Sequence, residues 1–189
     1  MSRPVRIFLI RHGEAAASWD TAVDPGLSEA GQAQARTLLP HFAALPGDRP
    51  AARLVSSPLQ RARQTAAPLA AHWALPVGIE DGVRELPSAG VPLEERRAWL
   101  TEVMAARWPA VDASLHAWRD RAWQALLACR EDTLFFTHFM VINALAGRVL
   151  GDDRLVVFEP DYCSVTELLL DGDACSLVAL GKARNTLVL

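Results

Sequence analysis

The sequence contains very little lysine and very little cysteine. Of its 19 basic residues only Lys182 is a lysine, and the other 18 (19 minus one) are arginines. Lysine forms Schiff bases and ends the phosphate-binding loop Gly-Lys-Ser/Thr, so we expect neither a lysine-centred mechanism nor that loop. The three cysteines are far apart, with no Cys-x-x-Cys pair. From this spacing we expect neither a disulfide framework nor a cysteine zinc site.

Long apolar segments and a strong net charge are also absent. The first ten residues lack the apolar stretch of a signal peptide, and no later segment is long enough to predict a membrane span. The net charge is −3, with acidic and basic residues mixed along the chain. No general attraction to nucleic acid or to an anionic membrane follows from such a balance. We therefore expect a cytoplasmic protein that has no nucleic-acid or membrane partner and that binds any anion locally.

The sequence does contain an alternating series of predicted strands and helices. Its 189 residues, 51% of them hydrophobic, suit one domain with a single core. Aliphatic runs and turn residues predict strands at 5–10, 53–56, 76–80, 132–137, 164–170 and 175–180. Helical spacing and capping residues, including Ser28 and Ser57-Pro58, predict helices at 27–45, 57–73, 93–108, 110–129 and 140–150. We predict a single-domain three-layer α/β/α sandwich over residues 1–189, with helices on both faces of a mostly parallel central sheet.

Charged and imidazole side chains lie near the ends of four predicted strands. Arg11 and His12 follow the first, Arg61 lies just into the helix after the second, Glu85 follows the third, and His138 closes the fourth. Ligands in open α/β sheets bind beyond the carboxyl ends of the strands, so we expect these five side chains to converge. Two arginines would repel a metal cation but can grip a phosphoryl group in bidentate fashion.

The other three residue types also fit phosphoryl chemistry. A neutral imidazole is a competent nucleophile toward phosphorus, and a covalent intermediate divides one hard step into two. A second, protonated imidazole would add positive charge where the transferring group needs it. A carboxyl group held neutral could protonate the leaving alcohol and then activate water.

Four segments resemble the motifs of the histidine phosphatase superfamily, also called the phosphoglycerate mutase-like family. They are Arg11-His12-Gly13-Glu14, residues 27–35, residues 56–66 with the sequence Ser-Ser-Pro-Leu-Gln-Arg-Ala-Arg-Gln-Thr-Ala, and Thr137-His138 after an apolar strand. Their order and spacing agree with the family, and together they span most of the chain.

The resemblance implies a phosphohistidine intermediate on His12 and a phosphate pocket made by Arg11, Arg61 and His138. It implies Glu85, in Arg84-Glu85-Leu86, as the proton donor, and it implies no metal or organic cofactor. The segment after Glu85 is short and the chain has a single tyrosine. In these two features it is similar to the phosphatase branch rather than to the mutase branch.

Three positions depart from the family pattern. Ser18 stands where the family often has an asparagine, which makes one contact with the phosphate shorter or removes it. Phe139 replaces a glycine after the second histidine and would restrict the approach of the backbone to the phosphate. Residues 87–90, Pro-Ser-Ala-Gly, replace an aromatic and glycine-rich stretch after the acidic motif, so other acidic residues remain as possible proton donors. These alternatives are Glu14, Asp24, Glu80 and Asp81.

The predicted function is the metal-independent hydrolysis of a small phosphorylated substrate. One alternative is a phosphate-binding module of the same fold without turnover, and another is a phosphatase of phosphohistidine in proteins. The segment 81–113 is predicted to select the substrate, whereas the natural substrate and the oligomeric state cannot be determined from the sequence. The four tryptophans at 99, 108, 118 and 123 are expected in the core, with the hypothesis that one or two line a lid selecting an apolar leaving group.

Overall fold

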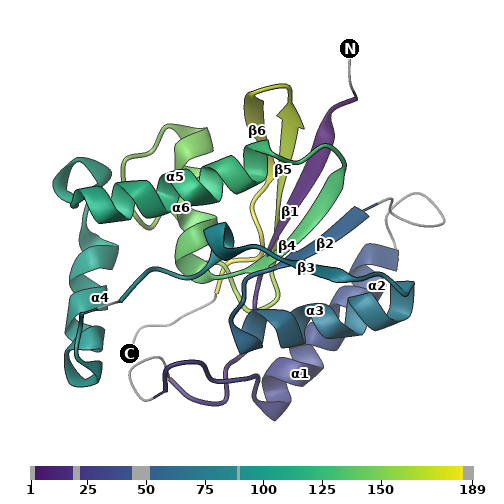
Figure 1. Ribbon diagram of the computed structural model, residues 1–189, viewed down its shortest axis with the longest axis horizontal. Coiled ribbons are helices and arrows are strands. Elements are labelled where there is room, and N and C mark those ends of the chain that lie inside the picture. The colour runs from purple at the N-terminus through teal and green to yellow at the C-terminus, as the bar shows by residue number, and fades with distance from the viewer. Residues whose placement is uncertain (1–2, 19–21, 44–51, 89, 185–189) are drawn as a thin grey trace.

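The computed structural model describes residues 3–18, 22–43, 52–88 and 90–184, and these contain one six-stranded sheet (Figure 1). Its order is β3-β2-β4-β1-β5-β6. The strands are β1 (Val5–Arg11), β2 (Ala52–Ser56), β3 (Val77–Ile79), β4 (Asp132–Thr137), β5 (Val165–Asp171) and β6 (Ala174–Ala179). The first four strands run parallel to one another, and β5 and β6 pair in antiparallel fashion. All six strands predicted from the sequence are confirmed, each to within one residue.

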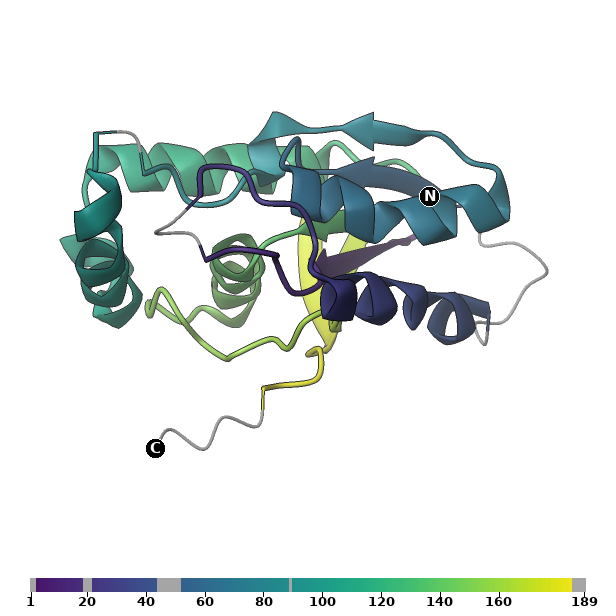
Figure 2. The same cartoon turned by 90° about the horizontal axis from the view of Figure 1, so that it is seen from below.

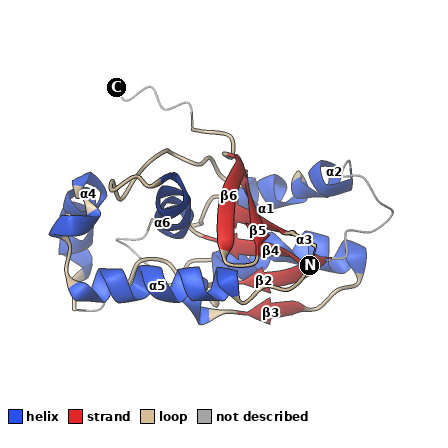
Figure 3. Ribbon diagram, turned by 90° about the horizontal axis from the view of Figure 1, so that it is seen from above, coloured by secondary structure: helices blue, strands red, loops and turns tan. Residues whose placement is uncertain are grey.

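Helices cover both faces of this sheet, as Figure 3 shows from above. On one face lie α1 (Glu29–Arg36), α2 (Leu38–Ala43) and α3 (Gln60–Trp73). On the other lie α5 (Ala113–Leu127) and α6 (Phe139–Leu150), with α4 (Arg96–Ala105) beyond them. Short 3-10 turns complete the chain: η1 (Asp81–Val83), η2 (Leu93–Glu95) and η3 (Trp108–Ala110). The predicted three-layer α/β/α sandwich is confirmed.

Alternate side chains of β1 enter two different halves of the core. Ile7 and Leu9 pack in the cluster beneath α5 and α6, whereas Phe8 and Ile10 pack in the cluster beneath α1, α2 and α3. All four are nearly fully buried, and each contributes about 1.5–3 kcal/mol to the free energy of unfolding. Because β1 is hydrogen-bonded to β4 on one side and to β5 on the other, the sheet fixes the position of the residues that follow its carboxyl end.

Ser28 is the N-cap of α1, as predicted, and its side chain accepts the N–H of Gly31. The prediction of one continuous helix over 27–45 is wrong, because the helix is interrupted at Thr37; residues 44 and 45 lie outside the described residues. The helix expected from Ser57 begins at Gln60, with Leu59 as an N-cap that makes no side-chain bond. Ser57 is not the cap because its hydroxyl contacts a histidine of the site described below.

The helix expected over 93–108 ends at Ala105. The N–H of Trp108 donates to the carbonyl of Asp153 at 2.8 Å, and Pro109 has no N–H with which to continue a helix. No helix in the described part of the chain combines the length and the apolarity needed to cross a bilayer.

Candidate active site

The carboxyl ends of β1, β2 and β4 bring four of the predicted site residues together. Arg11 ends β1, and the N–H of the next residue, His12, donates to the carbonyl of Thr137 at the end of β4 (3.0 Å). His138 follows β4, and its ring centroid lies 5.2 Å from that of His12. Arg61 lies in the first turn of α3, which follows β2. The segment after β1 and the segment before β5 border this end of the sheet (Figure 2).

The hydrogen bonds of His12 define which ring nitrogen can react. Nδ1 lies 2.7 Å from the carbonyl oxygen of Gly13. A carbonyl only accepts, so Nδ1 carries the proton and Nε2 carries the lone pair. Nε2 in turn accepts the Nε–H of Arg61 at 3.1 Å. The imidazole is thus held in the tautomer that presents a nucleophilic nitrogen beside a guanidinium group.

Both arginines are buried, Arg11 against a backbone carbonyl and two aromatic rings and Arg61 beside a carboxylate. The Nη1–H of Arg11 donates to the carbonyl of Pro160 at 2.7 Å, and its guanidinium carbon lies 4.2 Å from the ring centroid of Tyr162 and 5.2 Å from that of Phe139. Arg61 lies 3.9 Å from a carboxylate oxygen of Asp24, which is an ion pair but not a hydrogen bond. Phe139 therefore packs against Arg11 at the start of α6, where its bulk replaces the expected glycine.

Three buried nitrogens of the cluster have no hydrogen-bond partner among the described residues: Nε of Arg11, Nη1 of Arg61 and Nδ1 of His138. Buried polar groups are seldom left unpaired, because each costs about 1–3 kcal/mol. An oxyanion with several oxygens would satisfy them at once. This arrangement fits the bound phosphoryl group expected from the sequence.

His138 is oriented by a residue that the sequence analysis placed at a helix cap. Its Nε2 lies 2.7 Å from the hydroxyl oxygen of Ser57, and both side chains are fully buried. That hydroxyl also accepts the N–H of Leu59 at 3.3 Å and still has its own proton, which it can donate to Nε2. In that arrangement the proton of His138 is on Nδ1, the nitrogen without a partner among the described residues.

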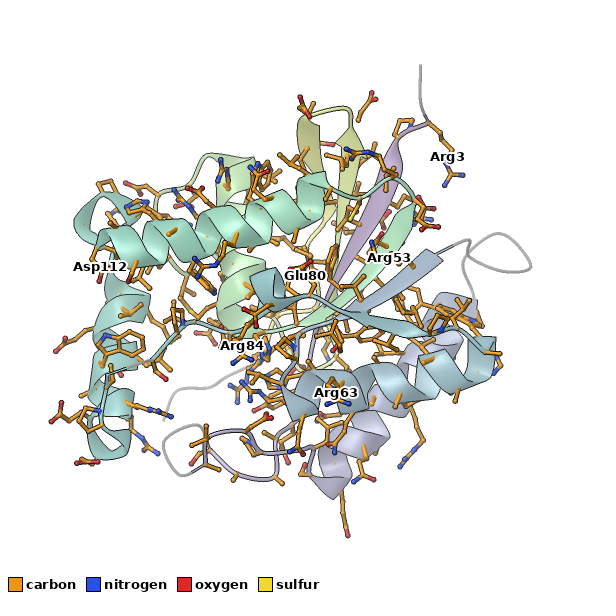
Figure 4. The ribbon with its side chains drawn as sticks, viewed as in Figure 1. Arg3, Arg53, Arg63, Glu80, Arg84 and Asp112 are labelled. Carbon is orange, nitrogen blue, oxygen red and sulfur yellow. The ribbon has the colours of Figure 1, made fainter. Side chains whose placement is uncertain are left out.

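Glu85 is the only acidic candidate that lines the cavity. Its carboxylate accepts the N–H of Leu86 at 2.9 Å. The alternatives are used elsewhere. Glu14 accepts from Ser28, Asp24 from the N–H of Gln60, Glu80 from the N–H of Gly82, and Asp81 pairs with Arg84. Figure 4 shows Glu80 and Arg84 on the segment that leads to Glu85.

Burial dominates the protonation of the site. Burial, followed by the charges of Arg61 and Arg11, lowers the pKa of His12 to about 3. Burial, with Arg61 next, also holds the pKa of His138 well below its usual range. Both imidazoles are therefore neutral at pH 7, so the positive charge of the site comes from the arginines and not from a protonated second histidine. Burial raises the pKa of Glu85, against the opposing effects of Leu86 and Arg61.

Arg11, His12, Arg61 and Glu85 line a cavity of about 550 Å³, whereas His138 is fully buried and is not among its lining residues. The cavity floor is polar and its walls are mainly apolar, with Tyr162 and Arg184 also in the lining. The apolar lining residues are Ala15, Ala16, Ala17, Pro25, Leu86, Leu100, Met104, Phe139 and Met140. Ser18 lines the cavity too, whereas none of the four tryptophans at 99, 108, 118 and 123 does. Trp108 and Trp118 are buried in the core, so the idea of a tryptophan lid finds no support in the contacts.

Two lining residues and one orienting residue were missed by the sequence analysis. Tyr162 and Arg184 lie outside every motif, and only the rarity of tyrosine in this chain could have drawn attention to Tyr162. Thr65 was seen as part of a motif without a role. Its hydroxyl accepts the N–H of Gly13 at 3.0 Å and donates to the carbonyl of Arg61 at 2.7 Å, so it joins the nucleophile loop to α3.

In the part of the chain that the structure describes, no three or more His, Cys, Asp or Glu side chains are grouped so that they could hold a metal ion. The residues that line the cavity floor are cationic or neutral apart from Glu85. The positive charge that would stabilise a phosphoryl group is supplied by two guanidinium groups.

Comparison with known proteins agrees with this geometry. A mycobacterial glucosyl-3-phosphoglycerate phosphatase is 21% identical with a TM-score of 0.70, covering 97% of this chain and 99% of that one. YhfR from Bacillus stearothermophilus is 21% identical with a TM-score of 0.77, covering 95% and 98%. A phosphoserine phosphatase from Entamoeba histolytica is 19% identical with a TM-score of 0.72, covering 95% and 98%. These similarities concern the fold.

No curated protein sequence matches this chain significantly. The family model of the histidine phosphatase superfamily (branch 1), however, matches residues 7–183. That range contains β2 to β6, β1 from Ile7 onward, and every site residue predicted from the sequence. The chain belongs to the histidine phosphatase superfamily, branch 1.

Proposed function

We propose that this protein hydrolyses small phosphomonoesters without a metal ion, by transferring the phosphoryl group to Nε2 of His12. The observation that carries the proposal is the tautomer of His12. Its Nδ1 proton is bound by Gly13 and its Nε2 lone pair is directed at Arg61. A neutral imidazole held in this way is a nucleophile that needs no base to activate it.

In the first step the Nε2 lone pair attacks phosphorus, the P–N bond forms, and the bond from phosphorus to the ester oxygen breaks. The nonbridging oxygens face Arg11, Arg61 and His138, whose unpaired donors would stabilise the charge of the transition state. Glu85, whose pKa is raised by burial, gives its proton to the leaving alkoxide. The product alcohol leaves, and phosphohistidine and the Glu85 carboxylate remain.

In the second step the Glu85 carboxylate takes a proton from a water molecule. The water oxygen attacks phosphorus on the side that the alcohol has left, and the P–N bond breaks. Inorganic phosphate, neutral His12 and protonated Glu85 are restored, so one carboxyl group acts first as an acid and then as a base. A single carboxyl group on the cavity wall suffices for both roles.

The test is the release of phosphate from p-nitrophenyl phosphate in the presence of EDTA, with wild type, His12→Gln and His72→Gln. His72 is exposed on α3, away from the cavity, and serves as the matched control. We expect turnover in wild type and His72→Gln, and a loss of at least about 10³-fold in His12→Gln. Rapid mixing followed by an alkaline quench should trap one phosphoryl group per chain on His12, detected by mass spectrometry.

Each other outcome points elsewhere. Activity that EDTA removes would contradict the proposed mechanism. Binding of inorganic phosphate without turnover or labelling of His12 would instead identify a phosphate-binding module. Turnover of phosphohistidine peptides, with none of phosphomonoesters, would identify a phosphatase of phosphohistidine in proteins.

A further inference from the structure

Arg184 lines the same cavity as the catalytic cluster but lies outside it. The family model ends at residue 183, so this arginine directly follows the matched segment. Hydrogen bonds nevertheless hold its backbone against a neighbouring loop. The N–H of Arg184 donates to the carbonyl of Glu159 at 2.8 Å, and the N–H of Asp161 donates to the carbonyl of Lys182 at 2.8 Å. These bonds pair the end of the described chain with the loop that carries Pro160, the acceptor for Arg11.

The side chain of Arg184 extends the cationic site toward the mouth of the cavity. The half-buried ring of Tyr162 lies between two guanidinium groups, 4.2 Å from the carbon of Arg11 and 5.5 Å from that of Arg184. Arg11 is buried, with 8% of its surface exposed, whereas Arg184 is exposed to solvent. The two cations thus lie at different depths along one wall, and Glu85 is the only acidic residue in the described lining.

The phosphoryl group does not need Arg184. A bound phosphoryl group presents three nonbridging oxygens, and three buried donors without partners already surround the nucleophile. The cavity volume of about 550 Å³ falls within the range that accommodates a whole small molecule, beyond a phosphoryl group alone. Arg184 is therefore available to a different part of the same substrate.

We propose that Arg184, positioned by Tyr162, binds a second anionic group on the leaving alcohol. This inference rests on the proposed phosphatase activity. The preferred substrates are then phosphomonoesters with a carboxylate or another acidic group remote from the phosphoryl group. The intervening carbon skeleton would lie against the apolar wall that includes Leu100, Met104 and Phe139. Arginine suits this role because its planar fork of donors matches a carboxylate.

The experiment compares two pairs of esters: 4-carboxyphenyl with 4-carbamoylphenyl phosphate, and the corresponding 3-substituted esters. The amide has nearly the shape of the carboxylate but no charge, so the ratio of kcat/KM within a pair reports on the second anion alone. We expect wild type to prefer at least one carboxylate by about three- to tenfold, the range for a partly exposed charge pair. Arg184→Gln should bring that ratio close to one, and Arg184→Lys should retain part of it.

Lys182→Gln is the matched control, because it removes a charge of the same sign two residues away. Its amine lies 3.8 Å from Asp161 and does not line this cavity, so the ratio should stay at the wild-type value. A ratio unchanged in Arg184→Gln, or no preference for either carboxylate in wild type, would overturn the inference.

Binding of 4-carboxybenzyl and 4-carbamoylbenzyl phosphonates, measured by calorimetry, needs no turnover. If the esters are not hydrolysed but the phosphonates show a carboxylate preference that depends on Arg184, the subsite stands and the proposed activity fails. If the esters are hydrolysed without that preference, the proposed activity stands and the subsite fails. If neither phosphonate binds and neither ester reacts, both proposals are wrong.

Discussion

Arg61 donates its Nε–H to Nε2 of His12 across 3.1 Å, and both side chains are buried. A cation so close to a neutral imidazole lowers its pKa further below the value that burial alone would set. The same guanidinium group retains an Nη1 without a hydrogen-bond partner in the described residues. Arg61 therefore adds to the effect of burial in keeping His12 neutral, and it retains a donor for the proposed phosphoryl group.

Two substitutions of Arg61 test whether its positive charge is sufficient or whether its fixed donor geometry is also needed. We expect Arg61→Lys and Arg61→Gln to lower kcat on p-nitrophenyl phosphate by about 10²- to 10³-fold, because a fixed transition-state donor is lost in both. Arg63, two residues along α3, is exposed (Figure 4), and Arg63→Gln should leave kcat within about twofold of wild type. Steady-state kinetics on the three variants give the answer, and an Arg61→Lys variant with wild-type kcat would contradict the assigned role.

Ser57 is expected to act as a positioning residue for His138. Loss of its hydroxyl in Ser57→Ala removes the 2.7 Å contact with Nε2, so the imidazole can change its tautomer. We expect kcat to fall by about tenfold or more with little change in KM, and Ser57→Thr to restore most of it. Nitrogen-15 NMR of the histidines should show a proton on Nδ1 of His138 in wild type and a mixture of tautomers in Ser57→Ala. A wild-type NMR pattern in the alanine variant would show that Ser57 has only a packing role.

The assignment of Glu85 as proton donor predicts a dependence on the leaving group. Glu85→Gln should lower the rate by about 10²- to 10⁴-fold for an alkyl phosphate, whose alkoxide must be protonated. The loss of the phosphorylation rate should be much smaller for p-nitrophenyl phosphate, because nitrophenolate leaves without a proton. Pre-steady-state kinetics with both substrates measure this difference. Equal losses for the two substrates would favour a structural role. Glu29→Gln, which removes an exposed carboxylate of α1 that does not line the cavity, is the matched control.

The lowered pKa values of His12 and His138 predict a loss of stability in acid. In the unfolded chain these imidazoles gain protons as the pH falls below about 6.5, while in the folded protein His12 stays neutral to about pH 3. The free energy of unfolding should therefore fall by up to about 1.4 kcal/mol per pH unit for His12 over that range, and the lowered pKa of His138 acts in the same direction. Urea unfolding from pH 7 to pH 4 measures the slope.

Removal of one histidine is expected to reduce that slope. His12→Gln should make it shallower, and His72→Gln should keep the wild-type value. The raised pKa of Glu85 acts in the opposite direction, since its contribution to stability is lost as the pH rises through its folded value. A slope that is identical in wild type and His12→Gln would show that burial of His12 does not contribute to acid unfolding.

Gly31 in α1 is expected to tolerate no side chain. A Cβ atom at this position would lie 2.1 Å from the backbone carbonyl oxygen of Glu14, and one at Gly13 would lie 2.6 Å from that of Gly31. Gly31→Ala should lower the free energy of unfolding by about 1–3 kcal/mol despite the better helix propensity of alanine. Ala30→Gly, one residue earlier and exposed, should cost about 1 kcal/mol through propensity alone. Denaturant unfolding of both variants tests this, and a neutral Gly31→Ala would contradict the close backbone approach.

Much of the fold and of the cluster could be predicted because it depends on local patterns. The short apolar runs Ile-Phe-Leu-Ile and Leu-Phe-Phe predict β1 and β4. Arg11 ends β1, and His12 and His138 directly follow the two strands. The helix boundaries were less predictable. Serine is a residue type that often caps a helix, but the hydroxyl of Ser57 contacts His138, which is 81 residues away in the sequence.

Local sequence patterns were enough to predict the strand ends and the residue types that meet there, and hence the available chemistry. The three-dimensional arrangement was needed to identify which of five acidic residues lines the cavity, how His138 is oriented, and that Tyr162 and Arg184 line the same cavity as Arg11. The physical reason is the sheet order β2-β4-β1-β5. It pairs β1 with β4 and β5, which are both more than a hundred residues away along the chain. No local pattern of apolar, polar or turn residues encodes which side chains such neighbours bring together.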